Sequence, residues 1–182
     1  MGLDELSLSE KPAIEILENL GYDHLAGSEL NEERHSTSEV VLRGRLENQL
    51  QTINPDVPKK AIDEALRQLT STQSPNLIDD NQVLHSQLVN GVQVEFEKDG
   101  EQVGRFVDPI DFENPENNDW LISTQYTVQV GDNPQRRPDM VIFINGLPLG
   151  VLEFKNPTDP KATLENAYNQ VNNRYRNDIS PL

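Results

Sequence analysis

Three charged side chains bracket the most apolar passage of this 182-residue chain. The passage, residues 136–157, reads "RRPDMVIFINGLPLGVLEFKNP", with Asp139 near its start and Glu153 and Lys155 near its end. Two carboxylates that meet across neighbouring strands, about 5 Å apart, repel each other unless a cation lies between them. Mg²⁺ prefers oxygen ligands of this kind, and a protonated lysine beside it can hold a water molecule or offset charge developing on a phosphate. The pattern therefore predicts a site for metal-assisted chemistry on a phosphate.

Whether the three charges meet depends on the connection between the two predicted strands. Side chains alternate faces along a strand, so Glu153 and Lys155 share a face. A two-residue loop at Asn145-Gly146 would turn Asp139 to the opposite face, whereas a loop with an odd number of residues would place it opposite Glu153. Pro148 lacks the N–H that a tight hairpin ladder uses, so we predict an odd loop. The alternative is that the three charges are ordinary surface residues at strand ends.

The spacing of apolar residues predicts three helices early in the chain and one at its end. Leucine and isoleucine recur at helical intervals over residues 11–25, 38–55 and 57–71, and Gly21 is the expected C-cap of the first helix. Residues 159–177 read as the closing helix, with Asp159 as its N-cap. The inward face of that helix is predicted to carry Leu164, Tyr168, Val171 and Tyr175.

Alternating apolar residues predict the strands. They occur at 92–97 and 102–107, on either side of a turn at Asp99-Gly100, at 120–130, and in the two halves of the opening passage. Residues 82–91 read as a short helix or a strand. This order of elements predicts an α/β (α+β mixed) fold with a central mixed sheet flanked by helices. We expect an N-terminal helical region over residues 1–75 and a core over residues 76–182, together forming one compact domain.

The composition narrows the classes of function. The net charge of −16 argues against a nucleic-acid binder, because phosphate contacts need Lys and Arg. The charge is uneven, however, since residues 134–182 hold 5 acidic and 6 basic side chains out of totals of 31 and 15. No cysteine is present, no apolar run approaches the length of a membrane span, and the first residues do not resemble a secretory signal. We therefore expect a cytoplasmic protein. Any surface of it that contacts a polyanion should lie in the last third of the chain.

The charged triad resembles the motif of PD-(D/E)xK nucleases. Pro138-Asp139 and Glu153-Phe154-Lys155 stand in the motif positions. The surrounding words "TINP" (52–55), "NNDWLISTQYTV" (117–128), "NGLPL" (145–149) and "YRNDIS" (175–180) make most of the chain similar to the N-terminal nuclease domain of the R subunit of type I restriction–modification enzymes. The resemblance implies that residues 76–182 form a PD-(D/E)xK restriction-endonuclease-like core that cleaves double-stranded DNA with Mg²⁺. It also implies that Asp139 and Glu153 bind the metal and that Lys155 is catalytic.

The same resemblance implies a larger protein from a bacterium or archaeon. The R subunit of this family continues into an ATP-driven translocase and works with modification and specificity subunits. This chain has no G-x-x-x-x-G-K-[S/T] phosphate loop, so ATP is expected to bind the longer parent and not these residues. Two alternatives stay open: a non-catalytic scaffold or interaction module of the same fold, and a DNA-repair nuclease with the same core.

Further candidate residues surround the triad. The family usually carries Gln and Tyr four residues apart in the helix that follows the lysine, but here Gln170 and Tyr175 are five apart. Five residues rotate about 500° around an α-helix, which separates the two side chains. We therefore expect Gln170 at the site and Tyr175 in the core. The predicted phosphate contacts are Arg136, Arg137, Lys161 and Arg174, and Glu39 or Glu47 is a candidate additional metal ligand.

Overall fold

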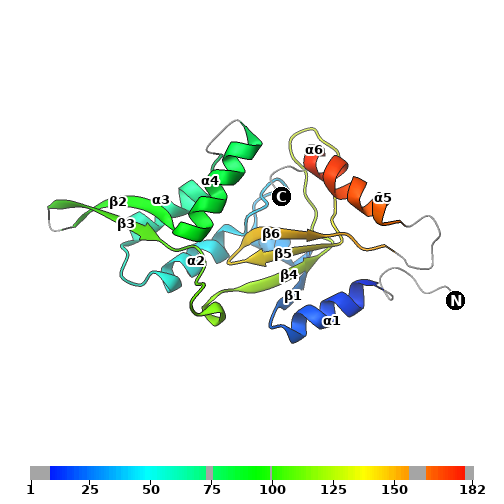
Figure 1. Cartoon of the computed structure of the whole chain (residues 1–182), viewed down its shortest axis with the longest axis horizontal. Helices are drawn as coiled ribbons and strands as arrows, with labels where there is room; N and C mark the ends of the chain where they lie inside the picture. The colour runs from blue at the N-terminus through cyan, green and yellow to red at the C-terminus, as the bar shows by residue number, and fades with distance from the viewer. Residues whose placement is uncertain (1–8, 73–75, 99, 156–162, 179–182) are drawn as a thin grey trace. The chain divides into compact units, whose positions relative to one another are not determined.

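The computed structural model describes residues 9–72, 76–98, 100–155 and 163–178 (Figure 1). Its strands form a four-stranded sheet and a separate two-stranded sheet. The larger sheet contains parallel and antiparallel pairs, so the predicted mixed α/β class with a central mixed sheet is confirmed. The chain falls into two compact units. The sheet unit comprises the described residues of Met1–Leu42 and Trp120–Leu182, and the hairpin unit comprises those of Arg43–Asp119. The boundary predicted between residues 75 and 76 lies inside the hairpin unit.

The sheet unit is built on four strands in the order β1-β4-β5-β6. β1 (Asp23–Ala26) runs parallel to β4 (Trp120–Thr124), while β5 (Met140–Ile144) is antiparallel to both β4 and β6 (Leu147–Leu152). The sequence of β5, MVIFI, is rich in β-branched and aromatic side chains, which suit a strand covered on both faces. β5 lies between β4 and β6 and is therefore an interior strand.

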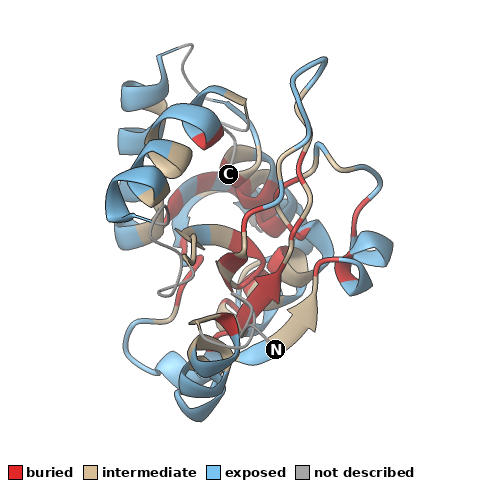
Figure 2. Ribbon diagram, turned by 90° about the vertical axis from the view of Figure 1, so that its right-hand side faces the viewer, coloured by how far each residue is buried: buried red, intermediate tan, exposed pale blue. Residues whose placement is uncertain are grey.

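One face of this sheet packs into the core of the unit. Leu121, Val141 and Phe143 belong to the buried cluster on this face, and Tyr126 meets Phe143 edge-to-face with 5.2 Å between ring centroids. The ring of Tyr175 joins the cluster from the C-terminal helical segment. Figure 2 shows the buried residues concentrated along the strands. The packing of Tyr175 against the strands holds the C-terminal segment over this face.

Short helices complete the sheet unit. α1 (Lys11–Asn19) lies beside β1 in Figure 1, and a 3₁₀ helix, η2, spans Glu29–Glu33. The C-terminal segment consists of α5 (Leu164–Asn169), a π-helix η4 (Gln170–Tyr175) and a last turn α6 (Arg176–Asp178). The predicted closing helix is thus present, but its middle turn has i→i+5 hydrogen bonding.

The hairpin unit confirms most of the local predictions made for it. α2 ends before Asn54-Pro55, as expected, and it packs against α3, with leucines buried on both helices. The Asn54 amide group donates to the Asp108 carbonyl and accepts the Asp108 N–H, both at 2.9 Å, which ties the end of α2 to the residue that follows β3. The elements are α2 (Arg43–Ile53), α3 (Lys59–Leu69), α4 (Leu77–Asn90), β2 (Val92–Lys98), β3 (Glu101–Val107) and η3 (Pro115–Asn117).

β1 was not predicted from the sequence. The first helix was predicted within residues 11–25 with Gly21 as its C-cap, and this is confirmed, because α1 ends at Asn19 and Gly21 follows it with a φ of 96°. Residues Asp23–Ala26 then extend along β4, so the expected N-terminal helical region also supplies an edge strand. A strand of four residues is too short to show a two-residue alternation in its sequence, and its pairing with a distant strand decides its conformation.

The predicted inward face of the closing helix was wrong at its start. Leu164 is 90% exposed and Tyr168 is 66% exposed, whereas Tyr175 is buried. The π-helical turn changes which residues face the same way as Tyr175, so the α-helical spacing no longer applies across it. The predicted N-cap, Asp159, lies outside the described residues, and the helix begins at Leu164 after Thr163, whose hydroxyl accepts the Asn166 N–H. Within the described ranges no helix is both long and apolar enough to cross a membrane.

Candidate active site

The turn between β5 and β6 contradicts the predicted odd loop. The two strands are joined by the two residues Asn145-Gly146, whose φ angles are 55° and 81°. Positive φ at both positions is the type I′ geometry that Asn-Gly favours, because it matches the twist of the flanking strands. This preference outweighs the missing N–H of Pro148, on which the prediction relied.

A β-bulge beside this turn restores the register that the site needs. The pairing shifts between Ile142 and Phe143, which leaves Leu149 as an extra residue on β6. The shifted register, continued past the last pair of the ladder, places Asp139 opposite Glu153. The two carboxylates therefore share one face of the sheet, the face that the C-terminal helical segment covers.

Asp139 is held by both neighbouring strands. Its carboxylate Oδ2 accepts the Phe154 N–H at 2.8 Å, which fixes the side chain against the end of β6. Its backbone carbonyl accepts the Gln125 N–H at 3.0 Å, just after the end of β4. Pro138, which precedes it, is buried. Asp139 thus enters β5 with its backbone and its side chain both oriented.

Glu153 and Lys155 belong to a closed ring of hydrogen bonds. Lys155 Nζ lies 2.7 Å from Glu153 Oε1 and donates to Gln170 Oε1 at 3.3 Å. Gln170 Nε2 donates to the Tyr175 hydroxyl at 2.8 Å, and that hydroxyl donates to Glu153 Oε2, also at 2.8 Å. The Glu153 side chain is only 4% exposed, against 21% for Lys155. A buried carboxylate is thus balanced by one cation and one neutral donor.

The π-helix explains how Gln170 and Tyr175 reach the same site. In η4 the hydrogen-bonded repeat is five residues, so side chains five apart face the same way, whereas in an α-helix they diverge. The expectation that Tyr175 belongs to the core and not to the site is therefore half correct. Its ring is buried in the core cluster, and its hydroxyl lies in the ring with Glu153 and Gln170. The five-residue spacing itself was the available signal, but a π turn was not considered.

Both carboxylates act on the Tyr175 hydroxyl. Burial raises its pKa above the ordinary value, the hydrogen bond from Gln170 lowers the pKa, and the hydrogen bond to Glu153 together with the charges of Glu153 and Asp139 raises it further. Tyr175 is therefore a neutral donor to Glu153 over the whole ordinary pH range. The effect of both charges on one hydroxyl is consistent with their shared face.

The donor set fits a magnesium ion. No cluster of three or more His, Cys, Asp or Glu side chains suited to a metal occurs in the described part of the chain. Mg²⁺ does not require one, because it retains several water molecules and is usually bound through one or two carboxylates plus substrate phosphate. Each carboxylate oxygen has two lone-pair sites, so Glu153 can accept its present donors and still approach a cation.

Three further residues were either missed or proposed only as additional metal ligands. Ser9, which sequence reasoning missed, donates from its hydroxyl to the Lys155 carbonyl at 3.2 Å and so ties the start of α1 to the end of the motif. Glu39 accepts the His35 N–H through its carboxylate, and Glu47 pairs with Lys59 in the hairpin unit. Neither of these glutamates is found in the hydrogen-bond ring around Lys155.

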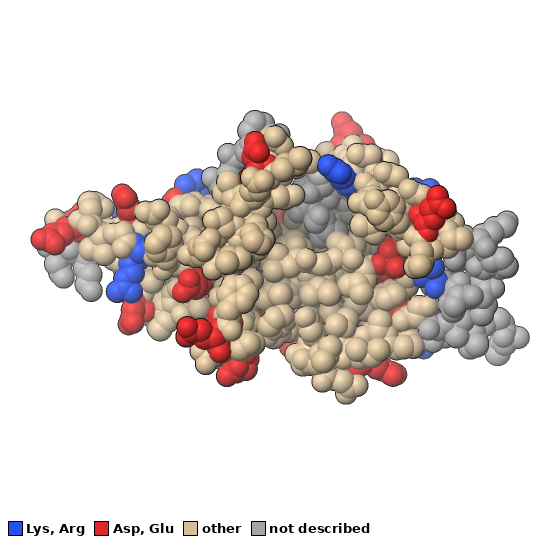
Figure 3. Space-filling view, in the orientation of Figure 1, with Lys and Arg blue, Asp and Glu red and all other residues tan. Residues whose placement is uncertain are grey.

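The predicted phosphate contacts differ in their availability. Arg136 forms an ion pair with Asp178, with Nε and Nη2 at 2.7 and 2.6 Å from Oδ2. Arg137 and Arg174 are exposed, and Lys161 lies outside the described residues. On the face in view in Figure 3, Lys and Arg side chains stand singly among acidic ones. Among the predicted contacts that the structure describes, Arg137 and Arg174 are therefore the more accessible to a phosphate.

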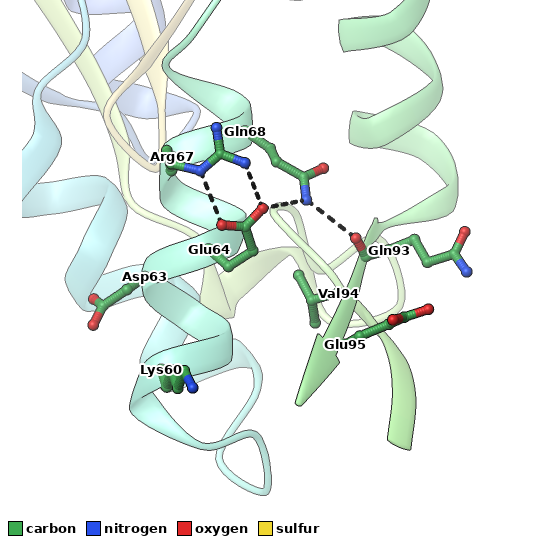
Figure 4. Close-up of a pocket in the computed structure, with 8 residues that line it drawn as sticks. All are labelled: Lys60, Asp63, Glu64, Arg67, Gln68, Gln93, Val94 and Glu95. Carbon is green, nitrogen blue, oxygen red and sulfur yellow. Dashed lines mark hydrogen bonds and ion pairs between the residues drawn. The ribbon is translucent and has the colours of Figure 1, made fainter. Parts of the chain in front are cut away.

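The hairpin unit has a pocket of its own, lined by residues between Lys60 and Glu95 (Figure 4). It is an open hollow of about 840 Å³ between α3 and β2, and it contains none of the predicted site residues. Hydrogen bonds from Arg67 and Gln68 lower the pKa of Glu64 to about 2, and Gln68 also donates to the Gln93 carbonyl. These polar groups form hydrogen bonds and an ion pair with one another. We therefore interpret the pocket as a solvated surface with a salt bridge.

Comparison with known proteins gives one family. A family model described as the type I restriction enzyme R protein N terminus matches residues 2–182. A relative named "Putative type I restriction enzyme MjaIXP endonuclease subunit", from Methanocaldococcus jannaschii, is 35% identical over 185 residues, which covers 99% of this chain and 18% of the relative. The type I restriction enzyme HindI endonuclease subunit of Haemophilus influenzae is 32% identical over 178 residues, which covers 95% of this chain and 17% of the relative. The chain thus spans less than a fifth of the length of these curated relatives.

Proposed function

The chain belongs to the family of type I restriction enzyme R protein N termini, and we propose that Asp139, Glu153 and Lys155 form a Mg²⁺-dependent site that hydrolyses DNA phosphodiesters. Such a site would make the domain a PD-(D/E)xK nuclease core. The observation that carries the proposal is the bulge in β6, which gives the register that brings Asp139 opposite Glu153. Lys155 then contacts Glu153 directly on the same face.

Each residue of the site has a distinct task in this proposal. Asp139 and Glu153 would hold the metal, which when bound lowers the pKa of a coordinated water and offsets negative charge on the phosphate. Lys155 would donate to the attacking water or to a phosphate oxygen, where negative charge grows during hydrolysis. Glu153 orients the lysine through the 2.7 Å contact between their charged groups.

Gln170 and Tyr175 would act through these groups. Tyr175 fixes Glu153 Oε2, and Gln170 holds both the Tyr175 hydroxyl and the Lys155 ammonium group. A carboxylate or ammonium with its rotamer fixed in this way loses less freedom when metal and DNA bind. We therefore propose that Gln170 is part of the catalytic site and that Tyr175 positions Glu153.

The rest of the relatives' length suggests what the domain would work with. Both relatives are named as endonuclease subunits of type I restriction enzymes. We propose that this domain receives double-stranded DNA from an ATP-dependent translocase in the longer subunit, within a complex that includes modification and specificity subunits. Arg137 and Arg174 would contact the DNA backbone beside the site, with Lys161 as a further candidate, while the pairing of Arg136 with Asp178 reduces its contribution.

Metal binding tests the proposal on this chain directly. Titration calorimetry with Mn²⁺ or Mg²⁺ should show one site in the wild type and none in Asp139→Asn or Glu153→Gln, because each substitution removes a charged ligand. Asp132→Asn is a matched control, since Asp132 is exposed in the turn before the motif. Equal binding by all four proteins would show that the motif carboxylates do not hold the ion.

Cleavage is the second test. A subunit of the relatives' length, assembled with its partner subunits, should cut plasmid DNA with Mg²⁺, and Lys155→Ala should abolish cutting while ATP hydrolysis continues. Continued cutting by Lys155→Ala would show that the lysine is only a surface charge with no catalytic role. Loss of both activities in the variant would point to a structural role for the lysine.

A further inference from the structure

Gln125 has a backbone conformation that its residue type rarely adopts. Its φ is 56°, in the left-handed region, where a side chain crowds the backbone. It follows the last residue of β4, and its N–H donates to the Asp139 carbonyl at 3.0 Å. Strained backbone persists only where its surroundings hold it, and such positions cluster at functional sites.

Gly27, the residue after β1, lies very close to the backbone of Gln125. Its N–H donates to the Thr124 carbonyl at 2.7 Å, which extends the β1–β4 ladder by one residue. A Cβ added to Gly27 would lie 2.6 Å from the Gln125 carbonyl oxygen and 2.7 Å from Tyr126 Cα. Both are backbone atoms that cannot rotate away. Only glycine allows β1 to approach Gln125 this closely.

Tyr126, the residue after Gln125, is fixed by its own contacts. Its side chain is fully buried, and its hydroxyl donates to the Glu39 and Val40 carbonyls at 3.2 and 3.3 Å. The Arg34 guanidinium group lies over the ring, 4.2 Å from its centroid. Gln125 is thus flanked by a glycine that allows close backbone approach and by a fully buried tyrosine, and in its left-handed conformation its N–H reaches the Asp139 carbonyl.

We propose that Gly27 and Gln125 form a backbone brace that positions Asp139 for metal binding. The brace fixes the Asp139 peptide from β4, while the Phe154 N–H fixes its carboxylate from the β6 side. Together they aim the carboxylate at the side of the sheet where Glu153 lies. Gly27 and Gln125 are positioning residues that act through Asp139, and the inference rests on the proposed metal site. What matters at Gln125 is its conformation and its N–H, not its amide side chain.

Two substitutions that both remove the amide side chain of residue 125, but differ in whether they accept positive φ, test this brace. Gln125→Val places a β-branched side chain where φ is positive, and Gln125→Gly removes the steric conflict while keeping the N–H. Asn145→Val is the matched control, because Asn145 has the same φ, 55°, but lies in the turn at the far end of β5 from Asp139. All three variants, with Gly27→Ala, are titrated with Mn²⁺ by calorimetry at temperatures where circular dichroism shows them folded.

Gln125→Val and Gly27→Ala should weaken Mn²⁺ binding by about 10- to 100-fold, the usual effect of losing support behind a metal ligand. Gln125→Gly should stay within about threefold of the wild type, since glycine accepts positive φ without strain. Asn145→Val should lower the melting temperature but leave Mn²⁺ affinity within about threefold, because its strain lies away from the carboxylates. Wild-type affinity in Gln125→Val, or equal losses in Gln125→Gly and Gln125→Val, would overturn the brace.

Hydrogen exchange of the Phe154 amide separates this inference from the proposed function, because it needs no metal. That amide donates to Asp139 Oδ2, so its protection reports the position of the carboxylate. Protection should fall in Gln125→Val and persist in Asn145→Val. If the wild type bound no metal while protection still followed this pattern, the proposed function would fail and the positioning of Asp139 by the brace would stand. Unchanged protection in Gln125→Val would refute the brace itself.

Discussion

Removing the Tyr175 hydroxyl tests how much the hydrogen-bond ring stabilises the Glu153 carboxylate. Tyr175→Phe keeps the buried ring in the core cluster and deletes only the oxygen. That oxygen donates to Glu153 Oε2 and accepts from Gln170 Nε2, each at 2.8 Å. The Glu153 carboxylate, with 4% of its side chain exposed, would lose one of the two donors that the described residues supply to it. The variant therefore isolates the support of one carboxylate from the packing around it.

The size of the effect follows from those two bonds. A hydrogen bond to a charged group contributes about 1.5–3 kcal/mol and a neutral one about 0.5–1.5 kcal/mol, but water reaching Glu153 would recover part of the loss. We expect a decrease of about 1–3 kcal/mol in the free energy of unfolding. For a chain of this length each kcal/mol lowers the melting temperature by about 2–4 °C. The control is Tyr168→Phe in the same segment, whose ring is 66% exposed and whose loss of oxygen should change nothing.

The dependence on pH gives the same prediction a second readout. Since the folded state raises the pKa of Tyr175, mainly through burial, the folded protein retains a proton that the unfolded chain releases near pH 10. The stability contributed by Tyr175 is therefore complete below pH 10 and declines as pH rises above it. Thermal unfolding at pH 8 and pH 11 should show the difference between wild type and Tyr175→Phe shrinking at the higher pH. Equal melting temperatures for Tyr175→Phe and Tyr168→Phe at pH 8 would show that the Tyr175 hydroxyl does not stabilise the fold.

Three further predictions concern the lysine, the π turn and the DNA contacts. Lys155→Met should leave the circular dichroism spectrum of this chain unchanged while removing DNA cleavage by the longer subunit, and residual cleavage near the wild-type rate would contradict its role. Deleting the exposed Asn173 restores a four-residue spacing in a regular α-helix, so Mn²⁺ affinity should stay within about threefold; a larger loss would show that the π turn itself is required. This chain should bind DNA more weakly than about micromolar without metal, given its charge of −16, and Arg137→Ala or Arg174→Ala should each reduce the slope of log affinity against log salt by about 1 in the longer subunit. An unchanged slope in both variants would place the DNA elsewhere.

Local signals explain which parts of the fold could be predicted from the sequence. α3 has apolar residues at helical spacing, and the β2–β3 hairpin has alternating strands around a glycine turn, so both were predicted. β1 could not be, because its four residues carry no pattern and gain their conformation from pairing with β4. The exposed start of the closing helix, Leu164, was misassigned because regular α-helical geometry was assumed across Gln170–Tyr175.

The candidate site shows the same division between local and non-local information. The types and positions of Asp139, Glu153 and Lys155 could be read directly, since the charges stand out at the ends of an apolar passage. The reason that they share a face could not, because the odd residue is a bulge at Leu149 and not part of the turn. A bulge depends on how two strands pack against the rest of the sheet, which no short stretch of sequence specifies.

Locating a bound ion in a crystal would show whether Asp139 and Glu153 hold it together. Crystals of this chain soaked in Mn²⁺ and measured at the manganese absorption edge would give an anomalous difference map. The account predicts one strong peak within about 2.5 Å of carboxylate oxygens of both Asp139 and Glu153, and its disappearance in Asp139→Asn. A map with no peak there at saturating Mn²⁺, or with manganese bound only at other carboxylates, would contradict the account.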